Sequence, residues 1–215
     1  MSGHEMSDVV VVRTGLANVA SVLAALRRLG VDGELSDDAG RVREAARVVF
    51  PGVGSFGAVA AVLDETGLRG ALRERVEQRL PTLGICLGMQ VLFESSEESP
   101  GAVGLGVAAG TVGRFVGDMT VPQMGWNRVQ TDGSCVILRS GYGYFANSYR
   151  VESVPAGWAG AVSEYGGGFV AGIERGSVVA CQFHPELSGD YGRGIFERWL
   201  AASEQRSSVD SGVVA

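Results

Sequence analysis

The sequence predicts a single α/β domain with a mostly parallel central sheet and flanking helices, and three observations carry that prediction. The chain has 215 residues, which is enough to bury one good-sized core without disulfide bonds. Its first half alternates short apolar runs with amphipathic segments, the pattern of parallel strands joined by helices. Its second half has short β-like segments between glycine-containing turns. We therefore expect added antiparallel strands in the C-terminal half, a domain over residues 8–201, and flexible tails at 1–7 and 202–215.

In the first half, each element follows from a local pattern. The run DVVVVR (8–13) predicts a buried strand. In ANVASVLAALRRLG (17–30) the apolar residues share one helical face, with Asn18 as N-cap and Gly30 as the stop. A short helix, a strand at 48–50 and a glycine-rich turn follow. An amphipathic helix, LRGALRERVEQRL (68–80), ends at Pro81, and TLGI (82–85) is a buried strand that runs into Cys86.

In the second half we expect β-like segments within residues 104–116, 121–130, 135–140, 143–151, 159–175 and 177–186. The stretch YGRGIFERWLAASEQ (191–205) predicts a closing helix, and the last ten residues have the composition of a frayed end. We find no internal repeat and no second domain.

Composition excludes several classes of function. The net charge of −6, without a basic run, argues against binding to nucleic acid. No apolar stretch reaches the roughly 18 residues of a membrane span, and the N-terminus has no pattern of a signal peptide. Three scattered cysteines leave at least one free thiol, which favours a reducing cytoplasm.

The segment GICLG (84–88) has the form G-x-C-x-G between an apolar strand and a helical run. This is the cysteine version of the nucleophile elbow, in which a tight turn presents the nucleophile at the carboxyl edge of the sheet. Glycines on both sides leave room for such a turn, and the positive end of the helix dipole favours a thiolate. Many buried cysteines are only small hydrophobic residues, and the local sequence leaves both interpretations of Cys86 open.

The segment VVACQFHPE (178–186) favours the catalytic interpretation. The chain has two histidines, His4 near the N-terminus and His184 at the end of this apolar run. A thiolate nucleophile needs a base beside it and a carboxylate that orients the base, and Glu186 follows two residues later. If the strand continues, Glu186 points the same way as His184, although Pro185 favours a bend. The alternative is a half-buried histidine at the end of a strand.

A third segment, FPGVGSFG (50–57), is a strand followed by glycine-rich backbone at the same sheet edge. Amide groups there can point at a developing oxyanion. An ordinary strand-to-helix turn is the alternative, and without the cysteine it would be the better one. A phosphate-binding loop is a poor interpretation, because no G-K-S/T follows.

Together these segments resemble the class I glutamine amidotransferases, whose triad is Cys-His-Glu. The finer resemblance is to the glutaminase subunit of imidazole glycerol phosphate synthase. It rests on PGVGSFG, GICLGMQVLFESSEE, MGWNRV, YFANSYR and QFHPELSG, which occur in that family's order and spacing. The resemblance implies that Cys86 attacks glutamine, that His184 protonates the leaving amine and then activates water, and that Glu186 orients His184.

The same resemblance implies the rest of the site. The oxyanion donors correspond to the amides of Val53, after a local peptide flip, and Leu87. The residues implied to hold L-glutamine are Gly54, Gln90, Glu98, Ser148 and Tyr149. No metal and no cofactor is implied. The implied partner is a (β/α)8-barrel cyclase that receives the ammonia in histidine biosynthesis, and the implied interface residues are Asn18, Met124, Trp126 and Asn127. A buried position for Trp126 within a sheet is an equally ordinary expectation.

Three positions depart from the family pattern. RTGLAN (13–18) stands where an Asp-Tyr-Gly-x-Gly-Asn motif is usual, Asn147 stands in place of a histidine, and Leu187 stands in place of a lysine. None belongs to the triad, but RTGLAN and Leu187 lie near the implied interface. Two alternatives therefore remain: an amidotransferase that serves another synthase, and a non-catalytic binding protein.

Overall fold

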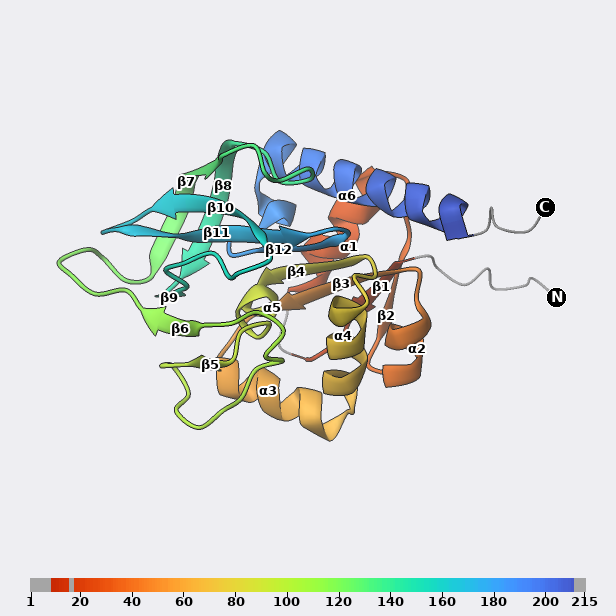
Figure 1. The fold of residues 1–215 in the computed structure, drawn as a ribbon, viewed down its shortest axis with the longest axis horizontal. Helices are drawn as coiled ribbons and strands as arrows, with labels where there is room; N and C mark the ends of the chain where they lie inside the picture. The colour runs from red at the N-terminus through yellow and green to blue at the C-terminus, as the bar shows by residue number, and fades with distance from the viewer. Residues whose placement is uncertain (1–8, 16–17, 211–215) are drawn as a thin grey trace.

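The computed structural model describes residues 9–15 and 18–210, and its largest feature is a nine-stranded mixed sheet (Figure 1). The strand order is β2-β1-β3-β4-β12-β11-β10-β7-β8, and a separate small sheet has the order β5-β6-β9. The strands are β1 (Val9–Val12), β2 (Gly33–Ser36), β3 (Arg47–Gly52), β4 (Thr82–Cys86), β5 (Ser95–Ser96), β6 (Thr111–Arg114), β7 (Gln123–Thr131), β8 (Gly141–Asn147), β9 (Tyr149–Arg150), β10 (Ala159–Glu164), β11 (Gly168–Arg175) and β12 (Val178–Cys181). The helices are α1 (Val19–Arg28), α2 (Ala39–Glu44), α3 (Phe56–Glu65), α4 (Leu68–Glu77), α5 (Leu87–Gln90), the 3-10 helix η1 (Pro185–Leu187) and α6 (Gly189–Asp210).

The predicted fold class is confirmed. Strands β2, β1, β3, β4 and β12 are parallel, whereas β11, β10, β7 and β8 extend the sheet with antiparallel pairings. All parallel strands therefore end at one edge, where ligands of open α/β sheets bind. The element β2 was not predicted, because this outer strand reads GELS and has no apolar run.

The segment 135–140, expected to be β-like, is not a strand. The backbone N–H groups of Val136, Ile137 and Leu138 instead donate to the carboxylate of Glu174, at 2.8–3.1 Å. A buried side chain thus takes the donors that a strand would give to a neighbouring strand, which explains why an apolar segment stays outside the sheet.

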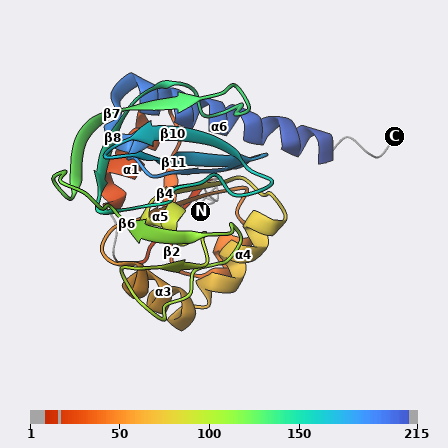
Figure 2. The ribbon, with the colours of Figure 1, turned by 60° about the vertical axis from the view of Figure 1, so that its left-hand side comes forward.

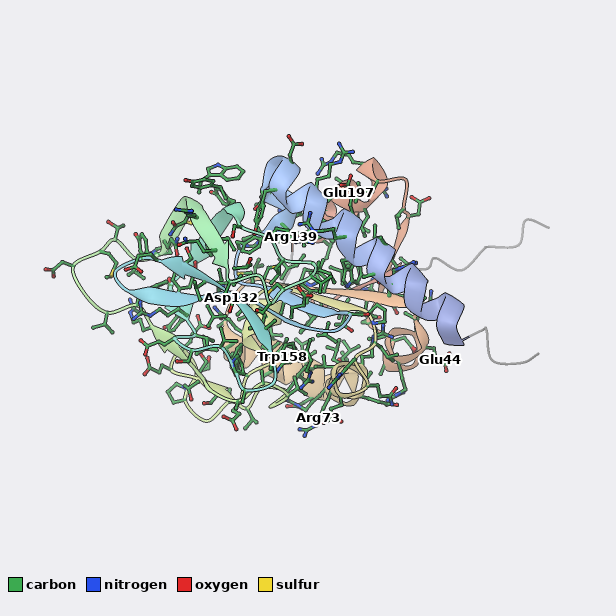
Figure 3. The ribbon with its side chains drawn as sticks, turned by 45° about the horizontal axis from the view of Figure 1, so that its top comes forward. Glu44, Arg73, Asp132, Arg139, Trp158 and Glu197 are labelled. Carbon is green, nitrogen blue, oxygen red and sulfur yellow. The ribbon has the colours of Figure 1, made fainter. Side chains whose placement is uncertain are left out.

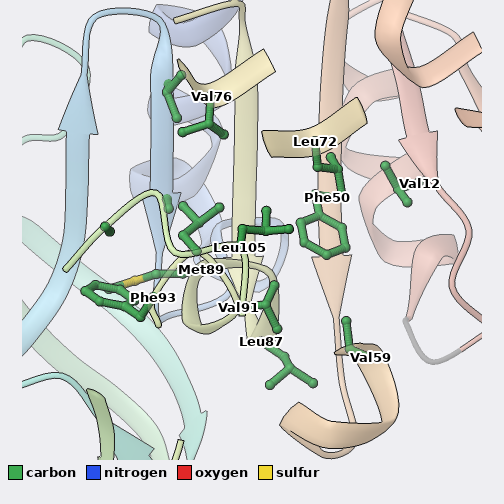
Figure 4. Close-up of a cluster of buried hydrophobic side chains, with 14 of the residues drawn as sticks. Val12, Phe50, Val59, Leu72, Val76, Leu87, Met89, Val91, Phe93 and Leu105 are labelled. Atoms are coloured by element: carbon green, nitrogen blue, oxygen red, sulfur yellow. The ribbon is translucent and has the colours of Figure 1, made fainter. Parts of the chain in front are cut away.

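Helices cover both faces of the sheet. Helices α1 and α6 lie on one face and α2, α3 and α4 on the other, as two views show (Figures 1 and 2). Alternation along β1 divides the core: Val9 and Val11 pack under α1 and α6, whereas Val10 and Val12 pack with the opposite layer. In that second layer the helix α5 and the loop after it insert apolar side chains beside Phe50 (Figure 4).

The closing helix α6 extends to Asp210, beyond the boundary expected at residue 201. Its Trp199 is fully buried and donates its indole N–H to the carbonyl of Ser177 at 3.2 Å. Charged side chains such as Glu44, Arg73 and Glu197 project from the outer surface (Figure 3). Of the expected tails 1–7 and 202–215, residues 202–210 belong to α6, and residues 1–7 and 211–215 lie outside the described residues. No helix of the described chain is long and apolar enough to cross a membrane.

Candidate active site

The turn at the end of β4 has the geometry of a nucleophile elbow. Cys86 has φ 53° and ψ −109°, and it is one of only two non-glycine residues of the described chain with positive φ, the other being Arg79. Helix α5 begins at the next residue, Leu87. An L-residue adopts this backbone conformation only where the surrounding structure enforces it, and such strain concentrates at functional sites.

The two glycines of GICLG are needed for the steric reason predicted from the sequence. A Cβ at Gly88 would lie 1.9 Å from the carbonyl oxygen of Phe50, and a Cβ at Gly84 would lie 3.1 Å from the oxygen of Gly88. Helix α5 therefore packs directly on the backbone of β3 and β4. This close contact fixes the turn that presents Cys86.

His184 reaches Cys86 because β12 is the parallel neighbour of β4, with Cys181 opposite Ile85. Its backbone N–H donates to the carbonyl of Tyr144 at 2.8 Å, and its side chain lines the same pocket as Cys86. Its Nδ1 lies 2.9 Å from Glu186 Oε1, and both side chains are about nine-tenths buried or more. The three residues expected to form a triad thus lie together: Glu186 is hydrogen-bonded to His184, and His184 shares a pocket with Cys86.

The route to Glu186 differs from the simplest expectation. The strand does not continue: β12 ends at Cys181, and residues 185–187 form η1. The bend at Pro185 turns Glu186 back beneath the imidazole, so a one-turn helix rather than strand alternation pairs the two side chains.

Electrostatics favour a protonated imidazole. Burial lowers the pKa of His184, but the hydrogen bonds and negative charge of Cys86 and Glu186 outweigh it and raise the pKa to about 10. The imidazole of His184 therefore carries a proton at neutral pH, and the carboxylate of Glu186 is its hydrogen-bond partner.

A pocket of about 200 Å³ opens in front of the cysteine. That volume lies below the ~300 Å³ of typical drug-sized sites, so the pocket suits a small molecule. It is lined by Val53, Gly54, Cys86, Leu87, Gln90, Glu98, Ala146, Asn147, Ser148, Tyr149 and His184. The lining includes every residue predicted for the oxyanion donors and for the substrate. Glu186 is the one predicted residue of the triad that does not line it.

Two of the lining side chains are already anchored. Glu98 Oε2 accepts from the backbone N–H of Phe56 at 2.7 Å, at the start of α3. Gln90 Nε2 donates to Gln182 Oε1 at 2.9 Å and to the carbonyl of Tyr149 at 3.3 Å. Sequence reasoning missed Gln182, which is fully buried beside the cysteine. Its position two residues before His184 was the available signal, because alternate residues of an extended segment share a side.

The predicted interface residues separate into two groups. Met124 and Trp126 are 64% and 58% exposed on one face of β7, so the buried alternative for Trp126 is wrong. Asn127 belongs to the opposite face and donates its Nδ2 to the carbonyl of Glu164 at 2.8 Å. Asn18 is exposed and holds the N-cap position of α1 without a side-chain capping bond. Of RTGLAN, residues 16–17 lie outside the described residues.

No group of three or more His, Cys, Asp or Glu residues suited to a metal ion occurs within the part of the chain that the structure describes. A ligand in the pocket would meet the side chains and backbone of the lining residues.

A cysteine at an elbow meets a histidine and a glutamate at the carboxyl edge of a parallel sheet, which is the arrangement expected of a class I glutamine amidotransferase. The family model for glutamine amidotransferase class-I matches residues 11–201. Solved structures agree at the level of fold. A glutamine amidotransferase aligns with TM-score 0.73 and 22% identity over 91% of this chain and 98% of that one. A putative GMP synthase protein from Thermoplasma acidophilum aligns with TM-score 0.70 and 21% identity over 97% and 99%.

Curated relatives identify the particular family. Imidazole glycerol phosphate synthase subunit HisH of Deinococcus radiodurans is 39% identical over 203 residues, which cover 90% of this chain and 94% of that protein. The chloroplastic imidazole glycerol phosphate synthase hisHF of Arabidopsis thaliana is 41% identical, and the chain spans 34% of its length. The chain belongs to the HisH family of class I glutamine amidotransferases.

Proposed function

We propose that this chain is the glutaminase subunit of an imidazole glycerol phosphate synthase and that it hydrolyses L-glutamine with Cys86, His184 and Glu186. The observation that carries the proposal is the hydrogen-bonded pair of His184 and Glu186, with His184 and Cys86 lining one pocket sized for an amino acid. Glutamate and ammonia are the products.

The geometry supports a division of roles among the three side chains. The thiolate of Cys86 attacks the carboxamide carbon, and the negative charge moves onto its oxygen. His184 gives its proton to the leaving nitrogen, the C–N bond breaks, and a thioester with ammonia remains. His184 then takes a proton from water, the hydroxide attacks the thioester, and glutamate leaves Cys86. Glu186 holds the imidazole in place and stabilises its charged form.

The oxyanion is stabilised by backbone amides in this proposal. Leu87 is the first residue of α5, and a helix offers no internal acceptor for the N–H of its first residue. The second donor is Val53, which follows β3 and precedes Gly54 with φ 100°. A glycine at that φ allows the peptide rotation that the second donation requires.

Substrate recognition follows from the charge of glutamine. Its ammonium is received by the carboxylate of Glu98, which the amide of Phe56 already holds in place. Its carboxylate is received by backbone and hydroxyl donors around Gly54, Ser148 and Tyr149, and its carboxamide lies between Cys86 and Gln90. All of these residues line the same pocket.

The partner in this proposal is a (β/α)8-barrel cyclase that takes up the ammonia and completes a step of histidine biosynthesis. The relatives support it, since one of them is a fused hisHF protein. The exposed pair Met124 and Trp126 is the proposed docking surface, because it is apolar and because Met124 pairs with Ala146, which lines the pocket. Residues 8–201 are the proposed functional domain, and a cytoplasmic location is supported by three buried free thiols.

The test uses the chain reconstituted with the cyclase from its own genome. Cys86→Ala is expected to abolish glutamine-dependent synthesis and to leave ammonia-dependent synthesis unchanged. Cys135→Ala is the matched control, because Cys135 is another buried thiol and lies outside the pocket. Loss of both activities in Cys86→Ala would contradict the division of labour. Binding to a different synthase, or no glutamine hydrolysis by the parent complex, would favour the alternatives.

A further inference from the structure

Gln182 has no part in the proposed chemistry, yet it touches the nucleophile. It follows β12, and its backbone N–H donates to the carbonyl of Ala171 at 2.8 Å, which continues the pairing with β11. The residue is fully buried. Its Nε2 donates to Cys86 Sγ at 3.8 Å, and its Oε1 accepts from Gln90 Nε2 at 2.9 Å. Both ends of one buried amide are therefore engaged.

These two bonds determine the orientation of Gln90. A side-chain amide has two N–H donors, and Gln90 directs Nε2 at Gln182 Oε1 and at the carbonyl of Tyr149. Gln182 can accept from Gln90 only while its own Nε2 points to the sulfur. Gln90 is thus left with Oε1, a pure hydrogen-bond acceptor, for the pocket that it lines.

The same arrangement acts on the sulfur. A thiolate is a much better acceptor than a thiol, because a hydrogen bond to a charged group is stronger than one between neutral groups. The Nε2–H of Gln182, which does not line the pocket, approaches Cys86 from inside the protein, whereas His184 lies on the pocket side with Cys86. The donor from Gln182 therefore stabilises the reactive form and restrains the side chain.

We propose that Gln182 is a positioning residue of the glutaminase: it holds the Cys86 thiolate and, through Gln90, makes the pocket select a carboxamide over a carboxylate. The inference rests on the proposed function. An acceptor oxygen facing the substrate attracts the amide hydrogens of glutamine. It repels the side-chain carboxylate of glutamate, so the product is released and does not compete.

Two variants separate the effects of the two hydrogen bonds of the Gln182 side chain. Gln182→Met keeps the approximate volume and removes both hydrogen bonds. Gln182→Glu keeps an oxygen that accepts from Gln90 but replaces the donor to sulfur with a negative charge. Thr82→Val is the matched control, because Thr82 is a buried polar residue at the opposite end of β4, far along the strand from Cys86.

The first measurement is alkylation of the chain by iodoacetamide between pH 5 and 10, followed at the peptide that carries Cys86. Both Gln182 variants should move the midpoint of the alkylation profile upward by about one pH unit, roughly a tenfold loss of thiolate at a given pH. Thr82→Val should keep the parent profile even if its melting temperature falls as far as theirs.

The second measurement is glutamine turnover with the cyclase present. Gln182→Met should lower kcat and raise KM by about tenfold each, with roughly tenfold stronger inhibition by glutamate. Gln182→Glu should lower kcat alone and keep KM within about threefold of the parent. A parental alkylation profile in both variants, or a parental ratio of glutamine to glutamate affinity in Gln182→Met, would overturn the inference, while loss of turnover in Cys86→Ala would still support the proposed function.

Discussion

Substitution of Gly88 by alanine is expected to be strongly destabilising. The added Cβ would lie 1.9 Å from the carbonyl oxygen of Phe50, whereas ordinary contacts begin at 3.4 Å, so α5 and β3 must separate by about 1.5 Å (3.4 − 1.9). Neither side can yield cheaply, because both are backbone and β3 is paired on each edge. Overpacking costs roughly 1–3 kcal/mol and occasionally more, and we expect the upper end here, about 3 kcal/mol.

The assay is thermal unfolding at fixed pH. For a domain of this size, about 3 kcal/mol corresponds to a fall in Tm of roughly 6–12 °C. Gly70→Ala is the matched control: Gly70 lies in α4, an added Cβ there would meet no atom within 4 Å beyond its own stretch of helix backbone, and alanine should raise the Tm by roughly 1–4 °C. A Tm for Gly88→Ala within 2 °C of the parent would refute the steric reasoning, as would an equal fall in the control.

Three further predictions concern Cys86, His184 and Glu174. Cys86→Gly should have a free energy of unfolding about 1–2 kcal/mol higher than Cys86→Ala, because φ is 53° at this position. The measurement is denaturant unfolding, and equal midpoints for the two variants would mean that the turn is unstrained. His184 has its pKa raised from 6.5 to about 10, so its stabilisation is full below pH 6.5 and is lost as the pH rises through 10. The difference in unfolding free energy between the parent and His184→Gln should shrink as the pH rises over that range, and a difference that grows with pH would contradict this prediction. Glu174→Gln should cost about 2 kcal/mol in urea unfolding, because one amide oxygen cannot accept from all the N–H groups of 136–138; an unchanged midpoint would contradict this.

The parts of the fold that sequence reasoning predicted are those with a local cause. Buried parallel strands such as β1 and β4 have continuous apolar runs, and the elbow at Cys86 needs its glycines within two residues. Periodicity could not find β2, whose residues are mostly half-exposed. Nor could it exclude a strand at 135–140, because the competing acceptor, Glu174, is far away in the sequence.

The candidate site, like the fold, could be predicted from the sequence only in part. The resemblance to a known family predicted which residues face one pocket, and the pocket is lined by all those expected as oxyanion donors and substrate ligands. The turn of η1 beneath His184, and the amide contacts of Gln182, depend on how β12 lies between β4 and β11. Such contacts join residues that are close only in three dimensions, so they required the structure.

The place of β12 between β4 and β11 also sets when the site comes into being during synthesis. Ile85 pairs with Cys181, so 96 further residues (181 − 85) must be translated before the elbow gains its neighbouring strand. At ribosomal speeds of roughly 5–20 residues per second, Cys86 therefore spends about 5–20 s in the growing chain before His184 has been translated. In the proposed reaction a nascent chain would release no ammonia, because the order of elements along the polypeptide delays assembly of the site until nearly the whole domain has emerged.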